Sequence, residues 1–462
     1  MNRFVLVVSG PSRGPVHSHL CWNVRGPRPR LARIARLAVL VALATTSALV
    51  RAEPPLTLGE TQRIATERSK KLDASDFAVS ASKDLTVAAA ERPDPIAKIG
   101  LENLPINGSE RFSVQQDFMT MRSVGITQEI TRPAKLRART VESEQAVQLA
   151  ETQKMQAVVE VQRDSALAWL DRYYAEAQEQ TVLQQVGVAR LDETAAEAAY
   201  RGGHGTAADV LAARAALAES EDLDAEASRT VRAAKLALQR WIGEAAERPL
   251  AGHPSIDSIP LHRHSLDSQL AEHPEILALK RREDLARASA EVARADRHPD
   301  WSVEFMYSER GIGYSNMVTL ELTVPLEIRR AYRQDPKLAA KLAEASQAKA
   351  EREDMLRAHT AEISTLIDAW DSARERLERY RNSIIPLAAD RTTAARAAYR
   401  GGKATLNDLL LAQHGEIDAR LKALQLGESA AHLWAQLTFL NATQSDADVS
   451  TPHLDSAQGE LP

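Results

Sequence analysis

A long internal repeat constrains the fold of this chain more than any other feature. Residues 194–213, TAAEAAYRGGHGTAADVLAA, return at residues 393–412 as TAARAAYRGGKATLNDLLLA, with 13 of the 20 positions identical. The two copies lie 199 residues apart, whereas the units of solenoid proteins are about 20–50 residues long. The repeat therefore indicates that half of the chain has been duplicated, and we expect the same order of helices and strands in both halves.

The composition favours long helices over ordinary globular domains. Aromatic residues make up only 4% of the chain and charged residues 26%, and long stretches are rich in Ala, Glu, Leu, Arg and Gln. Such stretches are typical of long helices and coiled coils. The net charge is −5 at pH 7, which gives no overall electrostatic basis for binding nucleic acid. We therefore expect no nucleic-acid partner.

The N-terminal region resembles a secretory signal. Basic residues between Arg30 and Arg36 precede an apolar run over 37–50, and Val50-Arg51-Ala52 fits a cleavage site. The apolar run is short for a membrane helix, although an N-terminal anchor helix is the alternative interpretation. We predict a signal peptide with an N-terminal extension over residues 1–52, in which residues 1–29 stem from a misassigned start.

The single cysteine limits the chemistry of the mature chain. Cys21 precedes the apolar run and does not lie at the predicted cleavage point, so we expect neither lipid attachment through cysteine nor disulfides nor thiolate metal sites. After the signal, we expect a first structural repeat over 53–262, a second over 263–441 and a C-terminal tail over 442–462.

Each repeat is predicted to contain a helix, a strand pair, a long helix, a tight turn and a returning helix. The opening helices are expected over 57–90, where Thr57 and Glu60 form a capping box, and over 265–297. The long helices are expected over 133–200 and 331–399, about 68 residues and about 100 Å each. Gly187 and Pro386 are equivalent weak points, which predicts a shared bend.

The turn between the long and returning helices has the pattern RGGxxTxxD in both repeats. The paired glycines are expected to end the long helices, because glycine accepts the left-handed conformation. Thr206 with Asp209 and Thr405 with Asp408 form capping boxes for the returning helices, which run to about residues 241 and 440. An opening and a returning helix are each about half the length of a long helix. Stacked end to end, they give four columns of about 100 Å per protomer.

Alternating apolar and polar residues predict four strands, each with one apolar and one polar face. The alternation is clear over 301–307 and 318–324 and weaker over 97–102 and 124–130. The predicted apolar, lipid-facing set is Trp301, Val303, Phe305, Val318, Leu320, Leu322 and Val324. The predicted polar, lumen-facing set is Lys98, Glu102, Glu304, Glu321 and Thr323.

Four such strands cannot close a barrel alone, and lipid does not tolerate open sheet edges. Three copies related by threefold symmetry supply twelve strands, within the range of outer-membrane barrels. We therefore predict a mainly α fold with a membrane β-barrel. The protomer is internally duplicated and gives four strands to a trimeric barrel, which continues as a long α-helical periplasmic tube. A soluble sheet packed on helices is the alternative.

At the level of motifs, the chain resembles the TolC-type outer-membrane efflux channel family. The resemblance rests on LTLGETQRIATERS, VGITQEITRPAKLR, AEHPEILALKRR, RHPDWSVEF, VTLELTVPLEIRRA and both YRGG tips. It implies a homotrimer in the outer membrane of a Gram-negative cell that extends into the periplasm. It also implies a passive channel that works with a periplasmic adaptor (membrane fusion protein) and an inner-membrane efflux pump. No second membrane anchor besides the barrel in outer-membrane lipid is expected.

The substrate is less clearly indicated than the family. HPDW together with QEITRPAKLR resembles the heavy-metal cation branch, which serves resistance-nodulation-division pumps. Efflux of drugs or organic solvents, or a type I secretion channel, is the alternative. A different class of function, a periplasmic coiled-coil adaptor or scaffold, is kept as a further alternative.

The resemblance also implies roles for the hairpin tips. Tyr399, Asp408 and Asp209 match positions of the network that closes the periplasmic entrance. The gate arginine of the family aligns with Ala404, so Lys403 beside it is the candidate cationic partner. For the two aspartates, helix capping is the competing interpretation. The residues expected to contact the adaptor are Arg201, Gly202, Gly203, Arg400, Gly401 and Gly402.

No residue pattern indicates an enzyme or a bound cofactor. A nucleophile, an acid–base pair and a phosphate-binding loop are not recognisable, so we expect no catalytic residues. Two groups of residues invite a metal interpretation, which we do not favour. The histidines are expected to be solvated loop residues, and the methionines to face lipid. The two groups are His253, His262, His264 and His273, and Met119 with Met121.

Overall fold

The structure of the chain is a computed structural model that describes residues 54–440. The predicted signal peptide, its extension with Cys21 and the tail over 442–462 lie outside the described residues. The helices and strands belong to one compact unit that begins at Pro55. Among the helices described, none is both long enough and apolar enough to cross a membrane.

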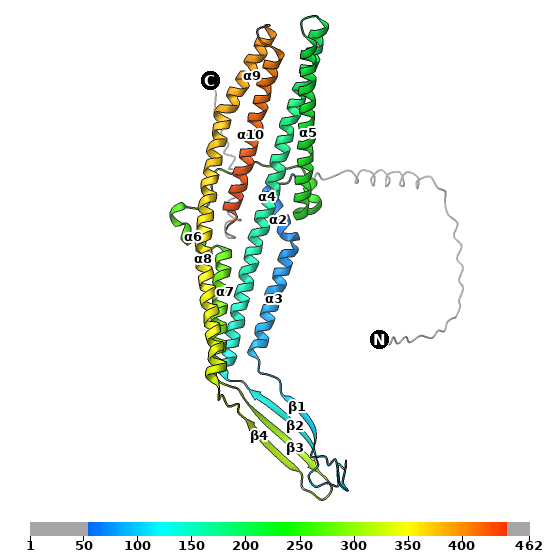
Figure 1. Ribbon diagram of the computed structural model, residues 1–462, viewed down its shortest axis with the longest axis vertical. Helices are drawn as coiled ribbons and strands as arrows, with labels where there is room; N and C mark the ends of the chain where they lie inside the picture. The colour runs from blue at the N-terminus through cyan, green and yellow to red at the C-terminus, as the bar shows by residue number, and fades with distance from the viewer. Residues whose placement is uncertain (1–53, 441–462) are drawn as a thin grey trace, which may run out of the picture. The chain divides into compact units, whose positions relative to one another are not determined.

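The first repeat has the predicted order of elements. Helices α2 (Leu58–Arg68) and α3 (Lys70–Ala90) precede strands β1 (Ile96–Glu102) and β2 (Met121–Ile130). The long helix α4 (Pro133–Arg201) has 69 residues, and the returning helix α5 (Ala207–Ile242) has 36. Both α3 and α5 pack along α4, as Figure 1 shows, so the predicted end-to-end stacking is confirmed.

The second repeat has the same order. Helices α6 (Leu266–Ala271) and α7 (Pro274–Ala295) precede strands β3 (Trp301–Arg310) and β4 (Met317–Thr323). The long column consists of α8 (Arg330–Arg379), a π-helical turn η3 (Tyr380–Ile384) and α9 (Ile385–Arg400), against which α10 (Leu406–Thr438) returns. Two short 3₁₀ segments, η1 (Gly243–Glu247) and η2 (Arg263–Ser265), lie in the connection between the repeats.

Both opening helices are broken, where the sequence predicted continuous ones. In the first repeat Ser69 adopts an extended conformation (φ −70°, ψ 109°), and its hydroxyl accepts a hydrogen bond from the Leu72 amide to start α3. In the second, Pro274 begins α7 and His273 before it is extended. Proline disfavours helical dihedrals in the preceding residue, so this break has a direct steric cause.

The predicted bend is present at Pro386 and absent at Gly187. At Pro386 the column does depart from α geometry, because proline offers no N–H to the carbonyl four residues earlier. The Ile385 amide bonds to the Tyr380 carbonyl five residues back, which makes the π turn. Gly187 produces no such interruption, since α4 is one α-helix from Pro133 to Arg201. A glycine keeps its N–H, so it weakens a helix without removing a bond.

The four strands form one antiparallel sheet in the order β1-β2-β3-β4. Strand β2 of the first repeat pairs with β3 of the second along their full lengths, from Met121 opposite Arg310 to Ile130 opposite Trp301. Within the described residues, β1 and β4 therefore each have a neighbour on one side only. Figure 1 shows the sheet at one end of the helices and both hairpin turns at the other.

The main apolar core lies where opening and returning helices meet along α4. Trp169 and Leu170 of α4 are fully buried there, together with Leu56 and Leu238. The Trp169 indole donates a hydrogen bond to the Leu56 carbonyl (3.1 Å), which satisfies its only polar atom. Leu56 also forms a parallel bridge to Leu250. This cluster fixes the ends of the half-length helices against the middle of the long one.

Candidate functional site

The first candidate region is the apolar face of the sheet. The register places Phe305 opposite both Ile126 and Leu320, and Tyr307 opposite both Val124 and Val318. Side chains on this face are open to solvent: Ile99 is 88% exposed, Leu320 75% and Leu322 61%. The register thus places the predicted residues of β3 and β4 on one face of the sheet, whereas Val324 lies just beyond β4: they are Trp301, Val303, Phe305, Val318, Leu320 and Leu322.

The opposite face of the sheet is polar and internally paired. Lys98 of β1 forms an ion pair with Glu304 of β3, and the Thr127 hydroxyl between them donates a hydrogen bond to the same carboxylate (2.9 Å). Glu321 lies opposite Glu304, and the Thr323 hydroxyl donates to Glu321 (3.3 Å). One cation thus partly balances two neighbouring carboxylates.

Other residues of the first repeat also lie on or near the polar face. Glu102 and Met121 are paired on it, so Met121 does not lie on the apolar face as expected. Met119 precedes β2 in an exposed loop. At Gly125 an added Cβ would come within 2.8 Å of the Phe305 carbonyl, so only glycine fits this close approach of β2 to β3.

The second candidate region comprises the two hairpin tips, which have the same hydrogen bonds. In the first, the amides of Gly202 and Gly203 bond to the Ala198 and Tyr200 carbonyls. In the second, Gly401 and Gly402 repeat this pattern. The second glycine of each pair has positive φ, 74° at Gly203 and 67° at Gly402, which explains the glycine at that position.

Both predicted capping boxes are present at the tips. The Thr206 hydroxyl accepts a hydrogen bond from the Asp209 amide (3.1 Å), and the Asp209 carboxylate accepts one from the Thr206 amide (2.8 Å). Thr405 and Asp408 repeat the arrangement at 3.2 and 2.9 Å. Hydrogen bonds from the Thr206 amide and hydroxyl lower the pKa of Asp209, and those from the Thr405 hydroxyl and amide lower the pKa of Asp408.

The two tips pack on each other through a small apolar cluster. Val210 and Ala213 of α5 contact Leu406 and Leu409 of α10, and Tyr399 packs against them. Burial raises the pKa of Tyr399, and the negative charges of Asp209 and Asp192 raise it further. The structure therefore brings Tyr399 close to Asp209 within one protomer.

Asp192 was not among the residues predicted from the sequence. Its pKa is raised by burial, which the side chains of Gln413 and Arg396 oppose. Its equivalent 199 residues later is Arg391. The opposite charges at these equivalent positions gave no indication that Asp192 is buried.

The other predicted tip residues are not brought together in the same way. Arg201 pairs with Glu197 one turn earlier in α4 (2.6 Å). Lys403 and Arg400 are exposed, and within the described chain neither forms an ion pair. A salt bridge from Lys403 to Asp408 or Asp209 is absent from this single protomer as described.

A third notable contact joins the sheet to the helices. Asp300, directly before β3, accepts a hydrogen bond from the Arg132 amide (3.0 Å) and pairs with Lys135 at the start of α4 (2.8 Å). The Asp300 side chain is 7% exposed. The motifs HPDW and TRPAKLR, which lie far apart in the sequence, are thus the two halves of one structural joint.

Part of the sequence matches a known protein family. Residues 266–443 match the family model described as Outer membrane efflux protein. The matched segment begins at α6 and extends past α10, so it covers the second repeat. No curated protein sequence matches the chain.

Solved structures share the fold over most of the chain. A membrane protein from Pseudomonas aeruginosa has a TM-score of 0.71 at 17% identity, covering 83% of this chain and 93% of its own. The Campylobacter jejuni CmeC outer membrane channel has a TM-score of 0.70 at 14% identity, with coverages of 85% and 87%. CusC, described as forming a transmembrane channel, has a TM-score of 0.71 at 15% identity, and the match covers 83% of this chain and 92% of CusC. The chain has the fold of outer-membrane efflux channels.

One of the predicted histidines, His273, differs from the expectation of solvated loop residues. His253 and His262 are exposed, and the Tyr173 hydroxyl lies 2.6 Å from His253 Nδ1. His273 instead is buried and stacks obliquely on His359 of α8, with ring centroids 4.7 Å apart. Burial, followed by the nearby His359 and Arg163, lowers the pKa of His273 to about 4. The sequence did not indicate this because His273 borders the helix break that was not predicted.

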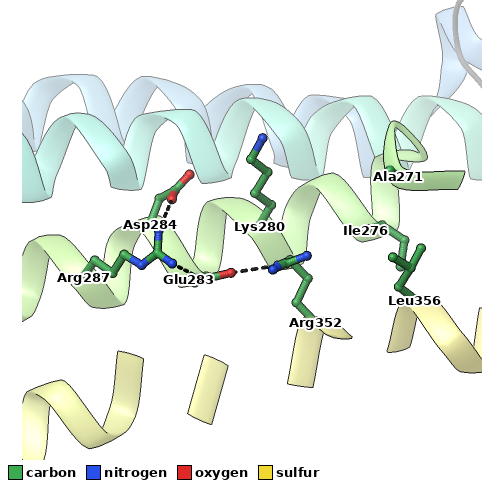
Figure 2. Close-up of a pocket in the computed structure, with 8 residues that line it drawn as sticks. All are labelled: Ala271, Ile276, Lys280, Glu283, Asp284, Arg287, Arg352 and Leu356. Carbon is green, nitrogen blue, oxygen red and sulfur yellow. Dashed lines mark hydrogen bonds and ion pairs between the residues drawn. The ribbon is translucent and has the colours of Figure 1, made fainter. Parts of the chain in front are cut away.

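A shallow pocket lies beside this histidine pair, between α7 and α8. Figure 2 shows Glu283 at its centre, held between Arg287 of its own helix and Arg352 of α8, whose Nε lies 2.7 Å from the carboxylate. The Glu283 side chain is 4% exposed. Since both arginines already neutralise this carboxylate, Glu283 acts as an inter-helical tie and not as a free acid or base.

Proposed function

We propose that this protein is the outer-membrane channel of a tripartite efflux system, and that it acts as a homotrimer. Its role is to conduct passively, across the periplasm and outer membrane, substrate that an inner-membrane pump delivers. The observation that carries the proposal is the sheet, which has two one-sided edges and one mainly apolar face whose side chains are exposed, beside a mainly polar face. Lipid is the environment that suits the apolar face, and neighbouring protomers satisfy the edges.

The periplasmic adaptor is proposed to bind the hairpin tips. Both tips expose an arginine and two glycines, at 201–203 and 400–402, at the end of the molecule away from the sheet. The rival assignment, a coiled-coil adaptor, does not account for a sheet whose apolar side chains face solvent.

Heavy-metal cations are the proposed cargo, delivered by a resistance-nodulation-division pump. Support comes from the motif resemblance at HPDW and QEITRPAKLR. These motifs meet at Asp300 and Lys135, in a joint that holds the sheet on α4, so they describe construction more directly than cargo. Drug or solvent efflux, and protein secretion, are therefore retained as alternatives.

The proposal is tested in the host cell. Deleting the gene should lower the minimal inhibitory concentration of divalent heavy metals, and the wild-type gene should restore it. A parallel series with drugs and solvents decides the cargo, while membrane fractionation reports location. Recovery of the protein in the soluble periplasmic fraction, with unchanged sensitivity to every compound, rejects an efflux channel. Drug sensitivity alone rejects only the heavy-metal cargo.

A further inference from the structure

The buried histidine pair between α7 and α8 has unused ligand atoms. His273 and His359 are each 7% exposed, and they lie on different elements, at the start of α7 and within α8. Within the described residues, His273 Nδ1 and His359 Nε2 are buried and have no hydrogen-bond partner. Leaving a buried polar nitrogen unpaired is unfavourable, because the atom has given up its hydrogen bonds to water without a replacement. A ligand that binds an unpaired nitrogen of each histidine would remove this cost at both rings.

A carboxylate completes the set. One ligand atom each from His273, Glu275 and His359 lie within 4.8 Å of one another. A tetrahedral zinc ion bound at about 2.0–2.1 Å needs its donor atoms about 3.4 Å apart. Side-chain rotations that shorten the distances between the donor atoms to about 3.4 Å let all three bind one ion. The backbone of His273 is fixed by two hydrogen bonds: its amide donates to the Leu270 carbonyl, and its carbonyl accepts from the Leu277 amide.

The surroundings resemble the outer sphere of a metal site. Glu362 lies 3.6 Å from His359 Nδ1, on the side of the ring away from the unpaired Nε2. A metal-bound histidine commonly directs its second nitrogen to a carboxylate, which fixes the ring and raises its basicity. The nearby cation Arg163 opposes a metal ion, but its guanidinium pairs with Asp164 (2.8 Å).

From this geometry we propose that His273, Glu275 and His359 bind one divalent transition-metal ion of the zinc type per protomer. The ion joins the start of α7 to α8 beside the helix break at Pro274. Two imidazoles and a carboxylate favour Zn²⁺, Cu²⁺ or Ni²⁺ over Mg²⁺ or Ca²⁺. The site depends on the packing of two helices and not on the cargo of the channel.

A second cluster, Asp171, Glu428 and His432, is not equivalent. His432 Nε2 already lies 2.6 Å from the Asp171 carboxylate, and Gln178 donates to Glu428 (3.0 Å). A metal ion there must displace an existing ion pair. This cluster serves instead as an internal comparison.

The test uses the full chain in detergent, purified without a polyhistidine tag and stripped with a chelator. Zn²⁺ is titrated in competition with a chromogenic chelator, and Co²⁺ is titrated while visible absorption is recorded. The wild type should bind one Zn²⁺ per protomer and give the absorption of Co²⁺ with nitrogen and oxygen ligands. His273→Gln and His359→Gln should each weaken Zn²⁺ binding at least about tenfold, and Mg²⁺ should not compete.

Controls separate this site from the other histidines. His262→Gln, on the exposed surface, and His432→Gln should leave the affinity for Zn²⁺ unchanged. The proposal is overturned if the wild type takes up no Zn²⁺ or Co²⁺ at micromolar concentrations, a result that needs no variant to fold. It is also overturned if His432→Gln removes binding, or if the double variant His273→Gln/His359→Gln binds as the wild type does.

Discussion

At the scale of residues, the hairpin tips combine local capping with contact between repeats. Asp209 is bonded to Thr206 in its own turn, and its charge also acts on Tyr399 of the other hairpin. Capping and closure are therefore roles that one carboxylate can hold together. The charge of Asp192 acts on the tyrosine in the same direction.

Closure at the tips should depend on several weak contacts acting together. Exposed charge pairs contribute roughly 0–1 kcal/mol each, so one substitution is expected to have little effect. In a planar bilayer, Asp209→Ala combined with Tyr399→Phe should raise single-channel conductance more than either change alone. Asp209→Asn is the control, because it removes the charge and keeps a side-chain oxygen that can accept the hydrogen bond from the Thr206 amide. If the double variant conducts like the wild type, the constriction lies elsewhere.

A pH effect on stability arises from His432. The hydrogen bond to Asp171 raises the pKa of His432, against the lowering effect of burial. A raised pKa in the folded state means that the ion pair stabilises the protein below the ordinary histidine pKa of about 6.5. This stabilisation is lost as the pH rises through the folded-state value.

Thermal unfolding should therefore show a larger loss of Tm between pH 6 and pH 8.5 in the wild type than in His432→Gln. Burial also raises the pKa of neighbouring Glu428, and this group is present in both proteins. Equal slopes in the two proteins contradict the role given to the ion pair.

At the scale of elements, patterns with a local physical cause were the ones that could be predicted. Period-two alternation indicated the four strands, and the RGGxxTxxD pattern indicated both turns with their caps. The breaks at Ser69 and His273 were missed because each lies inside an otherwise helical pattern. At Ser69 the next helix starts with a hydrogen bond from the Leu72 amide to the serine hydroxyl, which the sequence pattern alone does not specify. The bend predicted at Gly187 was wrong, because packing along α4 outweighs the low helix propensity of glycine.

The two faces of β4 should respond differently to substitution. Leu320 projects from the apolar face and is 75% exposed in the protomer, whereas Glu321 lies on the polar face. If the apolar face contacts lipid, Leu320→Arg should cost about 2–4 kcal/mol near the bilayer midplane and reduce assembly in the membrane. Glu321→Gln should instead alter conductance and leave assembly intact. Normal assembly of the arginine variant, judged by heat-modified migration on gels, contradicts the assigned face.

At the scale of the whole molecule, the duplication explains why one sheet contains strands of both repeats. The central pairing, β2 with β3, joins the two copies, and the outer strands leave edges for neighbouring protomers. The fold of the protomer was predictable because its signals are contained in one chain. The number of protomers depends on how edge strands of different chains pair with each other. The sequence of one chain supports three protomers only because a membrane barrel must close.

The polypeptide mass of the detergent-extracted complex tests the central claim most directly. The complex is extracted from outer membranes and measured by light scattering, with the contribution of detergent subtracted. The account predicts a single species of three protomers, because three four-stranded sheets are what closes a twelve-stranded barrel. A monodisperse monomer that stays soluble without detergent contradicts the account.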